Sequence, residues 1–301
     1  MNLNQIMLAE GVVRAFKHRP FVRLRLKEAD MQTPDHLGQT PGQLLHLMRT
    51  KNPLVQNITN FVAMNIAANV MLAAGASPAM VHTKEEAGEF ARIASALTIN
   101  IGTLSPDFLA GMIEAAKAAG EAGKPWVLDP VAHFATSYRR AAVAELLELR
   151  PTIIRGNASE IIALAGSRSS GHGVDSGDSV IAAEGAAIVL AQQNACVVAV
   201  TGEVDFVTDG RRSARILGGS SLMPRVTALG CSLTGVTGAF VAAAPDMPFE
   251  ATIAALAMFA VAGQQAAEKA SGPGSFAPLF LDRLAGLTPD ELDAEARVVS
   301  A

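Results

Sequence analysis

The sequence predicts an α/β fold in which a mainly parallel central sheet is covered by helices on both faces. From residue 40 onward, short apolar segments alternate with helical segments, and this order is typical of right-handed βαβ units. Half of the chain is hydrophobic but only 5% is aromatic, which favours helices packed closely over the sheet through small side chains. Because no linker or change in composition follows residue 40, we expect residues 31–301 to form one domain.

Capping residues and turn glycines predict the helices. Thr83 and Glu86 have the spacing of a capping box. Ser105 followed by Pro106 is a typical helix start, and Gly75 is a typical helix end. The expected helices cover 41–49, a segment capped by Asn57 or Asn60 that runs to 74, and then 84–95, 106 onward, 138–149, 158–165, 178–193, 230–244, 248–270, 277–284 and 289–298.

Short apolar segments predict the strands. Asp209-Gly210 lies between two alternating segments and predicts a hairpin. The expected strands are 79–81, 97–101, 125–128, 152–154, 195–200, the hairpin over 206–217 and a short β-type segment over 225–227, with a polar loop over 167–177.

Charge and cysteine content argue against several classes of protein. The net charge of -4 argues against a nucleic-acid or anionic-membrane partner, and no apolar run reaches the roughly 18 residues that span a bilayer. Neither of the two cysteines has a C-x-x-C partner, so a disulfide framework or a zinc site is not indicated. Residues 1–30 are basic and lack the apolar core of a signal peptide. We interpret them as a poorly ordered extension of a cytoplasmic protein.

Polar residues follow the carboxyl ends of five successive predicted strands. In open α/β sheets, ligands bind at this edge. Carboxylates there suit Mg²⁺, which prefers oxygen ligands and keeps most of its waters. The residues are Asn100, Gly102 and Thr103 after the first of these strands, then Asp129, Asn157 with Glu160, Thr201, and Gly230 with Cys231.

Gly230 and Cys231 open a predicted helix of small residues. The free N–H groups and the dipole at a helix start favour a bound anion or phosphate, and a thiol in the first turn is expected to have a lowered pKa and an accessible thiolate. The alternative interpretation is a turn glycine followed by a packed small side chain. The local spacing does not distinguish an anion-binding helix start from this structural interpretation.

The other candidates also have structural interpretations. Asn157 and Glu160 have capping-box spacing, which accounts for both without a metal. Asp129 fits a turn, Arg139 an exposed helix surface and Met64 a core position. The chain has no Walker lysine motif, no G-x-G-x-x-G after a strand and no histidine triad spacing, so P-loop, nicotinamide and histidine-based hydrolase chemistry are not indicated.

Eight motifs occur in order along the chain. They are Gln56-Asn-Ile-Thr-Asn60, Gly75-Ala-Ser-Pro-Ala-Met80, Asn100-Ile-Gly-Thr103, Leu128-Asp-Pro-Val131, Arg155-Gly-Asn-Ala-Ser-Glu160, Thr201-Gly-Glu-Val-Asp205, the Gly230-Cys231 helix start and Gly272-Pro-Gly-Ser-Phe276. Together they resemble the hydroxyethylthiazole kinases of the ribokinase-like superfamily, over residues 40 to 287.

The resemblance implies transfer of the ATP γ-phosphate to the hydroxyl of 4-methyl-5-(2-hydroxyethyl)thiazole, with Mg²⁺. It also implies a ribokinase-like sheet without the lid of sugar kinases, and a homotrimer with the thiazole pocket at a subunit interface. By the matching motifs, Met64 packs on the thiazole, and Arg139 and Thr201 contact ATP. Asn157 and Glu160 match the motif that orders Mg²⁺ and its waters.

The resemblance also implies roles around the Gly230-Cys231 helix start. Cys231 stands where the superfamily usually has a catalytic Asp, and our hypothesis is that it accepts the proton of the substrate hydroxyl. Our hypothesis is also that the backbone amides of Gly230–Ser232 hold the transferring phosphoryl group, and that Asp129 helps Glu160 to order Mg²⁺ through water. The family commonly has Gly where this chain has Ala228, which leaves Ala228 as a substrate contact through its backbone. Because Ala adopts positive φ less readily than Gly, either the backbone there is ordinary or the anion cradle is altered.

Two other functions are compatible with the sequence. Another ribokinase-fold phosphotransferase would act on a pyridoxine-type or hydroxymethylpyrimidine-type alcohol, and a substrate panel would separate it from a thiazole kinase. A catalytically silent paralogue would bind ATP or thiazole as a sensor, and binding without turnover would reveal it.

Overall fold

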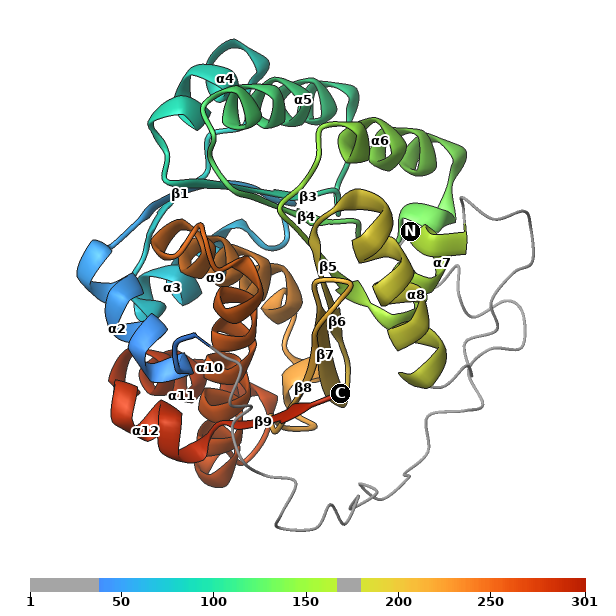
Figure 1. The fold of residues 1–301 in the computed structure, drawn as a ribbon. Helices are drawn as coiled ribbons and strands as arrows, with labels where there is room; N and C mark the ends of the chain where they lie inside the picture. The colour runs from blue at the N-terminus through green and yellow to red at the C-terminus, as the bar shows by residue number, and fades with distance from the viewer. Residues whose placement is uncertain (1–37, 167–179) are drawn as a thin grey trace, which may run out of the picture. The chain divides into compact units, whose positions relative to one another are not determined.

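The computed structural model describes residues 38–166 and 180–301, and all the strands in these ranges belong to one sheet (Figure 1). The predicted loop over 167–177 and the predicted extension over 1–30 lie outside the described residues. The division of the chain into that extension and one domain over 31–301 therefore stays a prediction. Within the described ranges, no helix is long and apolar enough to cross a membrane.

The sheet is mainly parallel, as predicted, and the described residues add no separate lid to it. Its strands are β1 (Leu54–Ile58), β2 (Ser77–Ala79), β3 (Ala96–Asn100), β4 (Trp126–Asp129), β5 (Ile153–Asn157), β6 (Val197–Thr201), β7 (Val204–Thr208), β8 (Ser213–Leu217) and β9 (Arg297–Ser300). The order is β2-β1-β3-β4-β5-β6-β7-β8-β9. Pairs from β2 to β6 are parallel, and β7, β8 and β9 extend the sheet in antiparallel pairs.

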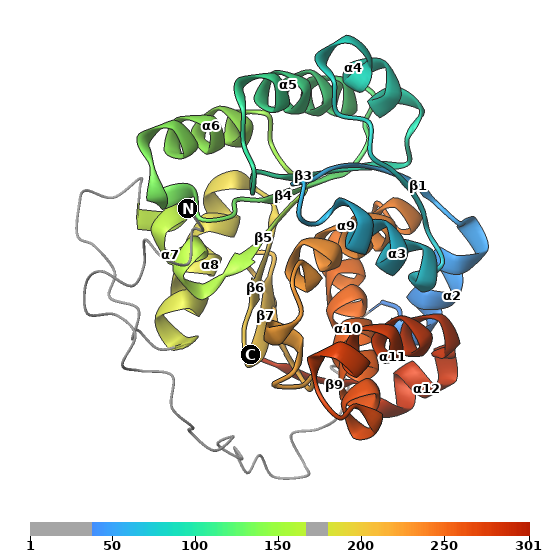
Figure 2. The ribbon, with the colours of Figure 1, turned by 180° about the vertical axis from the view of Figure 1, so that it is seen from behind.

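Helices cover both faces of the sheet, as predicted (Figure 1, Figure 2). On one face lie α4 (Lys84–Ile93), α5 (Pro106–Glu121), α6 (Ser137–Glu148), α7 (Ala158–Gly166) and α8 (Val180–Asn194). On the other lie α2 (Pro41–Lys51), α3 (Met64–Ala74), α9 (Leu229–Ala243), α10 (Pro248–Lys269), α11 (Pro273–Gly286) and α12 (Pro289–Glu295). Each set packs on the sheet through its own buried apolar cluster.

Strand β1 includes Asn57, so the prediction of Asn57 as a helix cap is wrong. Asn60, the alternative, follows β1, and its Oδ1 accepts from Ala63 N at 3.0 Å in the turn before α3. The polar strand residues Gln56 and Asn57 are buried and hydrogen-bonded inside the fold. The Gln56 side chain donates to the main-chain carbonyls of Val81 and Ala87, and Asn57 Oδ1 accepts from Thr98 Oγ1 at 2.7 Å. These bonds compensate most of the cost of burying the two polar side chains, although Gln56 Oε1 has no partner among the described residues. The strand therefore accommodates Gln56 and Asn57 between its apolar residues Leu54, Val55 and Ile58.

Two other segments differ from the prediction. Where a β-type segment is expected over 225–227, the 3₁₀ helix Met223–Arg225 ends and a turn follows it. The last helix, expected over 289–298, ends at Glu295, and the residues after it form β9 on the edge of the sheet. The remaining strands and helices are confirmed, with ends displaced by a few residues.

The predicted helix caps have mixed outcomes. Ser105 caps α5 as expected, since its Oγ accepts from Phe108 N at 3.2 Å. The capping box at α4 is wrong, because the Thr83 side chain accepts no main-chain N–H. Its hydroxyl lies 3.4 Å from the Glu86 carboxylate instead, to which it donates.

Helix α9 packs closely against the middle of the sheet, which fixes the position of its N-terminus. At Gly238 a methyl group would collide with the side chain of Thr98 in β3. One turn earlier, a methyl group at Gly235 would collide with Met71 in α3. Because both positions lack a side chain, the helix approaches closely and its first turn reaches the carboxyl ends of the strands.

Candidate active site

The carboxyl ends of the parallel strands bring the predicted polar residues together. Strand pairing places Asn100 beside Asp129 and Asn157 beside Thr201. The start of α9 lies at the same edge, because Thr234 Oγ1 donates to Asp129 Oδ2 at 2.8 Å. This edge is the candidate active site.

Asp129 is at the centre of a buried hydrogen-bond network. Its Oδ2 also accepts from Asn100 Nδ2 at 2.7 Å, and Arg155 Nη1 lies 3.4 Å away. Its Oδ1 is buried and has no hydrogen-bond partner among the described residues. Burial raises the pKa of Asp129, and the positive charge of Arg155 opposes that shift. An unpartnered carboxylate oxygen at this edge fits a cation or a cation-bound water.

Arg155 has no role in the sequence-based predictions, but the structure places it between three predicted site residues. Its Nη2 donates to Thr201 Oγ1 at 2.6 Å, and its Nη1 contacts Asp129. A methyl group at Gly230 would lie 3.2 Å from Nη2. Arg155 is only 8% exposed, and an arginine is rarely so buried without a partner. An arginine directly after the apolar segment 152–154 is the sequence signal that identifies it.

Cys231 lies in the first turn of α9, as predicted, but the predicted accessible thiolate is wrong. Burial raises the pKa of the Cys231 thiol, and the negative charge of Asp129 raises it further. The sulfur accepts from Asn60 Nδ2 at 3.3 Å, and the same amide donates to Asn100 Oδ1 at 2.9 Å. These hydrogen bonds do not offset the loss of water and the nearby carboxylate, so the thiol stays protonated at neutral pH.

Asn157 and Glu160 form the capping box that was one of their two predicted interpretations. Glu160 N donates to Asn157 Oδ1 at 2.9 Å, and Asn157 N donates to Glu160 Oε2 at 2.8 Å. Glu160 Oε1 accepts from Ala132 N at 2.9 Å, so the carboxylate also holds the loop after β4. The capping interpretation is confirmed, while the metal role stays a prediction.

The predicted ligand contacts Arg139 and Met64 have protein partners in the structure. Arg139, in the first turn of α6, donates to three main-chain carbonyls. Met64 begins α3 and is half-buried against the apolar cluster under α4 to α8. Met80, which the predictions leave out, is also half-buried and directly follows β2, beside the end of β1. It is a second candidate for an apolar contact to a substrate.

Ala228 precedes α9 with a left-handed backbone, φ 62° and ψ 7°. The alternative of an ordinary backbone at this position is therefore wrong. No side chain caps the first turn of α9, so its N–H groups are available to an anion.

Replacing Ala228 with glycine is expected to stabilise the protein by about 0.5–1 kcal/mol, because glycine adopts this conformation without a Cβ penalty. Urea unfolding of both proteins measures the difference. The matched control is Ala110→Gly within α5, which should instead destabilise by about 1 kcal/mol. Equal destabilisation at both positions would contradict the argument.

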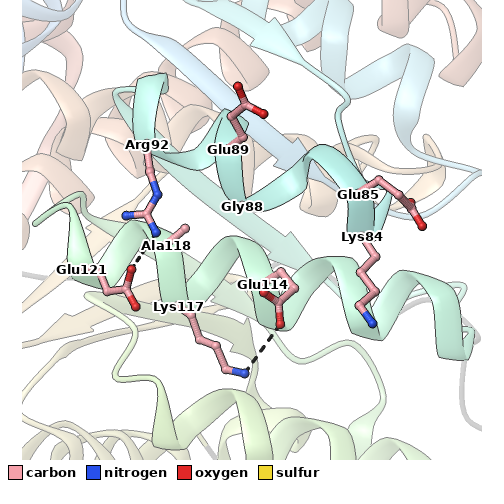
Figure 3. Close-up of a pocket in the computed structure, with 9 residues that line it drawn as sticks. All are labelled: Lys84, Glu85, Gly88, Glu89, Arg92, Glu114, Lys117, Ala118 and Glu121. Atoms are coloured by element: carbon pink, nitrogen blue, oxygen red, sulfur yellow. Dashed lines mark hydrogen bonds and ion pairs between the residues drawn. The ribbon is translucent and has the colours of Figure 1, made fainter.

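A surface groove of about 370 Å³ lies on α4 and α5 (Figure 3). It is lined by charged side chains, of which Arg92 pairs with Glu121 at 2.7 Å and Lys117 with Glu114 at 3.7 Å. These side chains are exposed, and ion pairs of this kind contribute little. None of the lining residues belongs to the cluster at the strand ends, so we assign the groove no role in the site.

The fold defines a class of protein, the α/β proteins with a ribokinase-like sheet. The structure of the pyridoxal kinase from Staphylococcus aureus in complex with AMP-PCP and pyridoxal shares the fold, with a TM-score of 0.52 and 16% sequence identity. That match covers 71% of this chain and 88% of the pyridoxal kinase chain.

The chain belongs to the hydroxyethylthiazole kinase family, whose profile matches residues 45–290. A hydroxyethylthiazole kinase of Rhizobium rhizogenes is 68% identical over 270 residues, which cover 90% of this chain and 100% of that protein. A hydroxyethylthiazole kinase from Cereibacter sphaeroides is 63% identical over 260 residues, which cover 86% of this chain and 98% of that protein. The structure of the hydroxyethylthiazole kinase protein from Pyrococcus horikoshii OT3 has a TM-score of 0.79 and 39% identity, covering 87% of this chain and 98% of that one. The resemblance found in the eight motifs is confirmed.

Proposed function

We propose that this protein transfers the γ-phosphoryl group of ATP to the hydroxyl of 4-methyl-5-(2-hydroxyethyl)thiazole, giving the thiazole phosphate for thiamine biosynthesis. Membership of the family supports this activity. The observation that carries it is the position of Arg155 and Asp129 directly beside the uncapped start of α9. Phosphoryl transfer needs positioned charge more than covalent chemistry, and a buried cation next to helix N–H groups supplies it.

Magnesium is the metal that the family resemblance implies, and the residues at this edge fit it. No three His, Cys, Asp or Glu side chains within residues 38–166 and 180–301 are grouped to hold a metal by themselves. Mg²⁺ suits such a site, because it keeps several waters and binds through one or two carboxylates and the substrate phosphates. We assign Asp129, through its unpartnered Oδ1, and Glu160, through water, as the residues that hold it. Mg²⁺ bound there would neutralise the phosphate oxygens.

The ATP phosphates are proposed to contact Thr201, the backbone at Gly230 and the Arg155 guanidinium. These three groups lie together, since Arg155 Nη2 donates to Thr201 and comes close to Gly230. A planar guanidinium matches phosphate oxygens in geometry as well as charge. The ATP contact predicted for Arg139 stays a prediction, and its guanidinium donates to three main-chain carbonyls in the structure.

The thiazole alcohol is proposed to lie near Cys231, with apolar contact from Met64 or Met80 and a backbone contact from Ala228. The side chains of Phe61 and Val62, just before α3, are 65% and 60% exposed. Exposed apolar groups beside the site support a homotrimer in which a second copy covers them and completes the pocket. The same proposal places the enzyme in the cytoplasm, where thiols stay reduced.

In this mechanism the protein residues position and polarise the reactants. The α9 amides and Arg155 stabilise the negative charge on the oxygens of the transferring phosphoryl group. The Asn60 amide donates to Cys231 and fixes the position of its sulfur, beside which the substrate hydroxyl is proposed to bind. Because the Cys231 thiol is protonated, its sulfur accepts a hydrogen bond from the substrate hydroxyl rather than the proton itself. The hydroxyl proton passes to a phosphoryl oxygen of the product as the new P–O bond forms and the bond to ADP breaks. A loose transition state makes only a small demand on a base.

Replacing Cys231 with alanine is therefore expected to reduce kcat by about 10- to 100-fold without abolishing it. Cys231→Asp should retain activity if the position supplies a proton acceptor. Steady-state kinetics measure both, with Cys196→Ala as the control, because Cys196 is a buried thiol directly before β6, at the end of that strand opposite to the site. An unchanged kcat in Cys231→Ala would show that the hydrogen bond from the hydroxyl to Cys231 has no role in catalysis.

The function is tested by ADP release from Mg-ATP with and without the thiazole alcohol. We expect turnover that depends on the thiazole and exceeds turnover with a pyridoxine-type or hydroxymethylpyrimidine-type alcohol. A preference for either of those alcohols would identify a different phosphotransferase. ATP binding with no turnover on any of the three would identify a silent paralogue.

A further inference from the structure

We propose that Asn100 is a positioning residue that holds Cys231 and Asp129 in a fixed arrangement. This inference rests on the proposed function, in which the alcohol binds beside Cys231 and Asp129 holds the metal. Asn100 is the last residue of β3, which lies between β1 and β4 in the sheet. The residue is buried, with 2% of its surface exposed. A buried amide at this position can bond to groups that follow both neighbouring strands.

The amide oxygen of Asn100 faces the side of the site that contains Cys231. Oδ1 accepts from Gly102 N at 3.0 Å and from Asn60 Nδ2 at 2.9 Å. Because a main-chain N–H only donates, the contact with Gly102 fixes which end of the amide is the oxygen. The same Asn60 Nδ2 donates to Cys231 Sγ at 3.3 Å, and Asn60 Oδ1 accepts from Ala63 N at 3.0 Å. The Asn60 amide is therefore held at both ends.

The amide nitrogen of Asn100 faces Asp129. Nδ2 donates to Asp129 Oδ2 at 2.7 Å, a short distance that is typical of a hydrogen bond to a charged group. Thr234 Oγ1 donates to the same carboxylate oxygen at 2.8 Å. Asp129 Oδ1 is the oxygen without a partner among the described residues. Asn100 therefore helps to fix which oxygen of the carboxylate is offered to a cation.

Three side-chain hydrogen bonds thus join Cys231 on α9 to Asp129 on β4, through Asn60 and Asn100. Burial and the charge of Asp129 raise the pKa of the Cys231 thiol, while the amides of Asn60 and Asn100 lower it. Both amides and the carboxylate therefore act on the same sulfur. An aspartate at position 100 would set a second carboxylate oxygen against Asp129, and an apolar side chain would leave both partners unpaired. Only an amide matches the donor on one side and the acceptor on the other.

Asn100→Ala and Asn100→Ser test the proposal, with Asn57→Ala as the matched control. Asn57 is also a buried strand asparagine, but it accepts from Thr98 and contacts the sulfur of Met71, which lie outside the site. Both alanine variants should lower Tm by about 5 °C, because each leaves a buried partner unpaired.

Steady-state kinetics with Mg-ATP and the thiazole alcohol should separate these variants. Asn100→Ala should lose about 10- to 100-fold in kcat, because small displacements of reacting groups are costly. KM for the alcohol should change by less than about threefold, as expected when no direct contact to it is lost. Asn100→Ser should behave in the same way, since its hydroxyl is too short to reach both partners. Asn57→Ala should keep the wild-type kcat.

Alkylation of Cys231 provides a readout that does not depend on turnover. In a Cys196→Ala background, Cys231 is the only cysteine of the chain. Its rate of reaction with iodoacetamide at pH 8 should fall by about threefold or more when Asn100→Ala is added, because amide groups that favour the thiolate are lost. Asn57→Ala should leave this rate unchanged.

Combined substitutions distinguish positioning from a direct contact with substrate. Asn100→Ala should cost a smaller factor in kcat when it is added to Cys231→Ala or to Asp129→Asn than in the wild type. The full factor in both backgrounds would mean that Asn100 acts on the substrate itself, and this would overturn the proposal.

Two further outcomes would also overturn the proposal. One is an equal loss of kcat in Asn57→Ala and Asn100→Ala, which would reflect destabilisation alone. The other is wild-type kcat and alkylation in Asn100→Ser, which would count even if Asn100→Ala fails to fold. Absence of thiazole-dependent turnover in the wild-type protein would instead contradict the proposed function, and alkylation would still decide whether Asn100 holds Cys231.

Discussion

Asp129→Asn is expected to lower kcat by about 10²- to 10³-fold, the range for removing one preorganised electrostatic group from an active site. Asparagine has nearly the same shape and its carbonyl still accepts from Asn100 and Thr234. The substitution removes only the charge that faces Arg155 and the unpartnered oxygen assigned to Mg²⁺. The protein should therefore fold, and its activity should require more Mg²⁺ than the wild-type activity does.

Steady-state kinetics over a range of Mg²⁺ concentrations, with thermal unfolding of each protein, measure this effect. The exposed Asp282 on α11 offers a matched control, and Asp282→Asn should leave kcat and the Mg²⁺ dependence unchanged. If Asp129→Asn had wild-type kcat at every Mg²⁺ concentration, neither the metal contact nor the charge at this position would matter for catalysis.

The sequence predicts the position of this site well, because its residues lie at strand ends. Asn100, Asp129 and Thr201 each end a strand with a recognisable apolar pattern, and parallel pairing necessarily brings such ends to one edge. The capping box of Asn157 and Glu160 is also predictable, since its hydrogen bonds depend on a spacing of three residues in one segment. Local signals of this kind do not require knowledge of tertiary packing.

Features that depend on tertiary contacts are not predicted. The helix start at Cys231 indicates a lowered thiol pKa, but burial and the charge of Asp129, which is distant in sequence, reverse the shift. Strand β1 is missed because Gln56 and Asn57 look like turn or cap residues until Thr98 and the segment after β2 supply their partners. Whether a polar side chain can be buried depends on hydrogen-bond partners that one segment does not reveal.

Arg155→Met is expected to lower kcat/KM for ATP by about 10²-fold or more, because it removes a charged hydrogen-bond donor from the phosphate site. It also leaves the buried Asp129 without its cation, so the already raised pKa of Asp129 should rise further. A carboxyl group with a raised pKa in the folded state favours that state when protonated, and this advantage is lost as the pH rises through that pKa. The variant should therefore be less destabilised near pH 5 than near pH 8.

Initial rates at varied ATP concentration and thermal unfolding at the two pH values measure both effects. Arg211→Met, in the exposed turn between β7 and β8, is the matched control. It should change neither kcat/KM for ATP nor the thermal stability at either pH. A destabilisation of Arg155→Met that is independent of pH would mean that Asp129 is not the group left unpaired.

The double substitution Asp129→Asn with Arg155→Met tests whether the pair acts as one unit. Residues that act together are not additive, so the double variant should lose little more activity than the more damaging single variant. It should also be more stable than Arg155→Met alone at pH 8, because neither buried charge then lacks its partner. Additive losses of activity would instead mean that Asp129 and Arg155 serve the metal and the nucleotide independently, despite their contact in the folded protein.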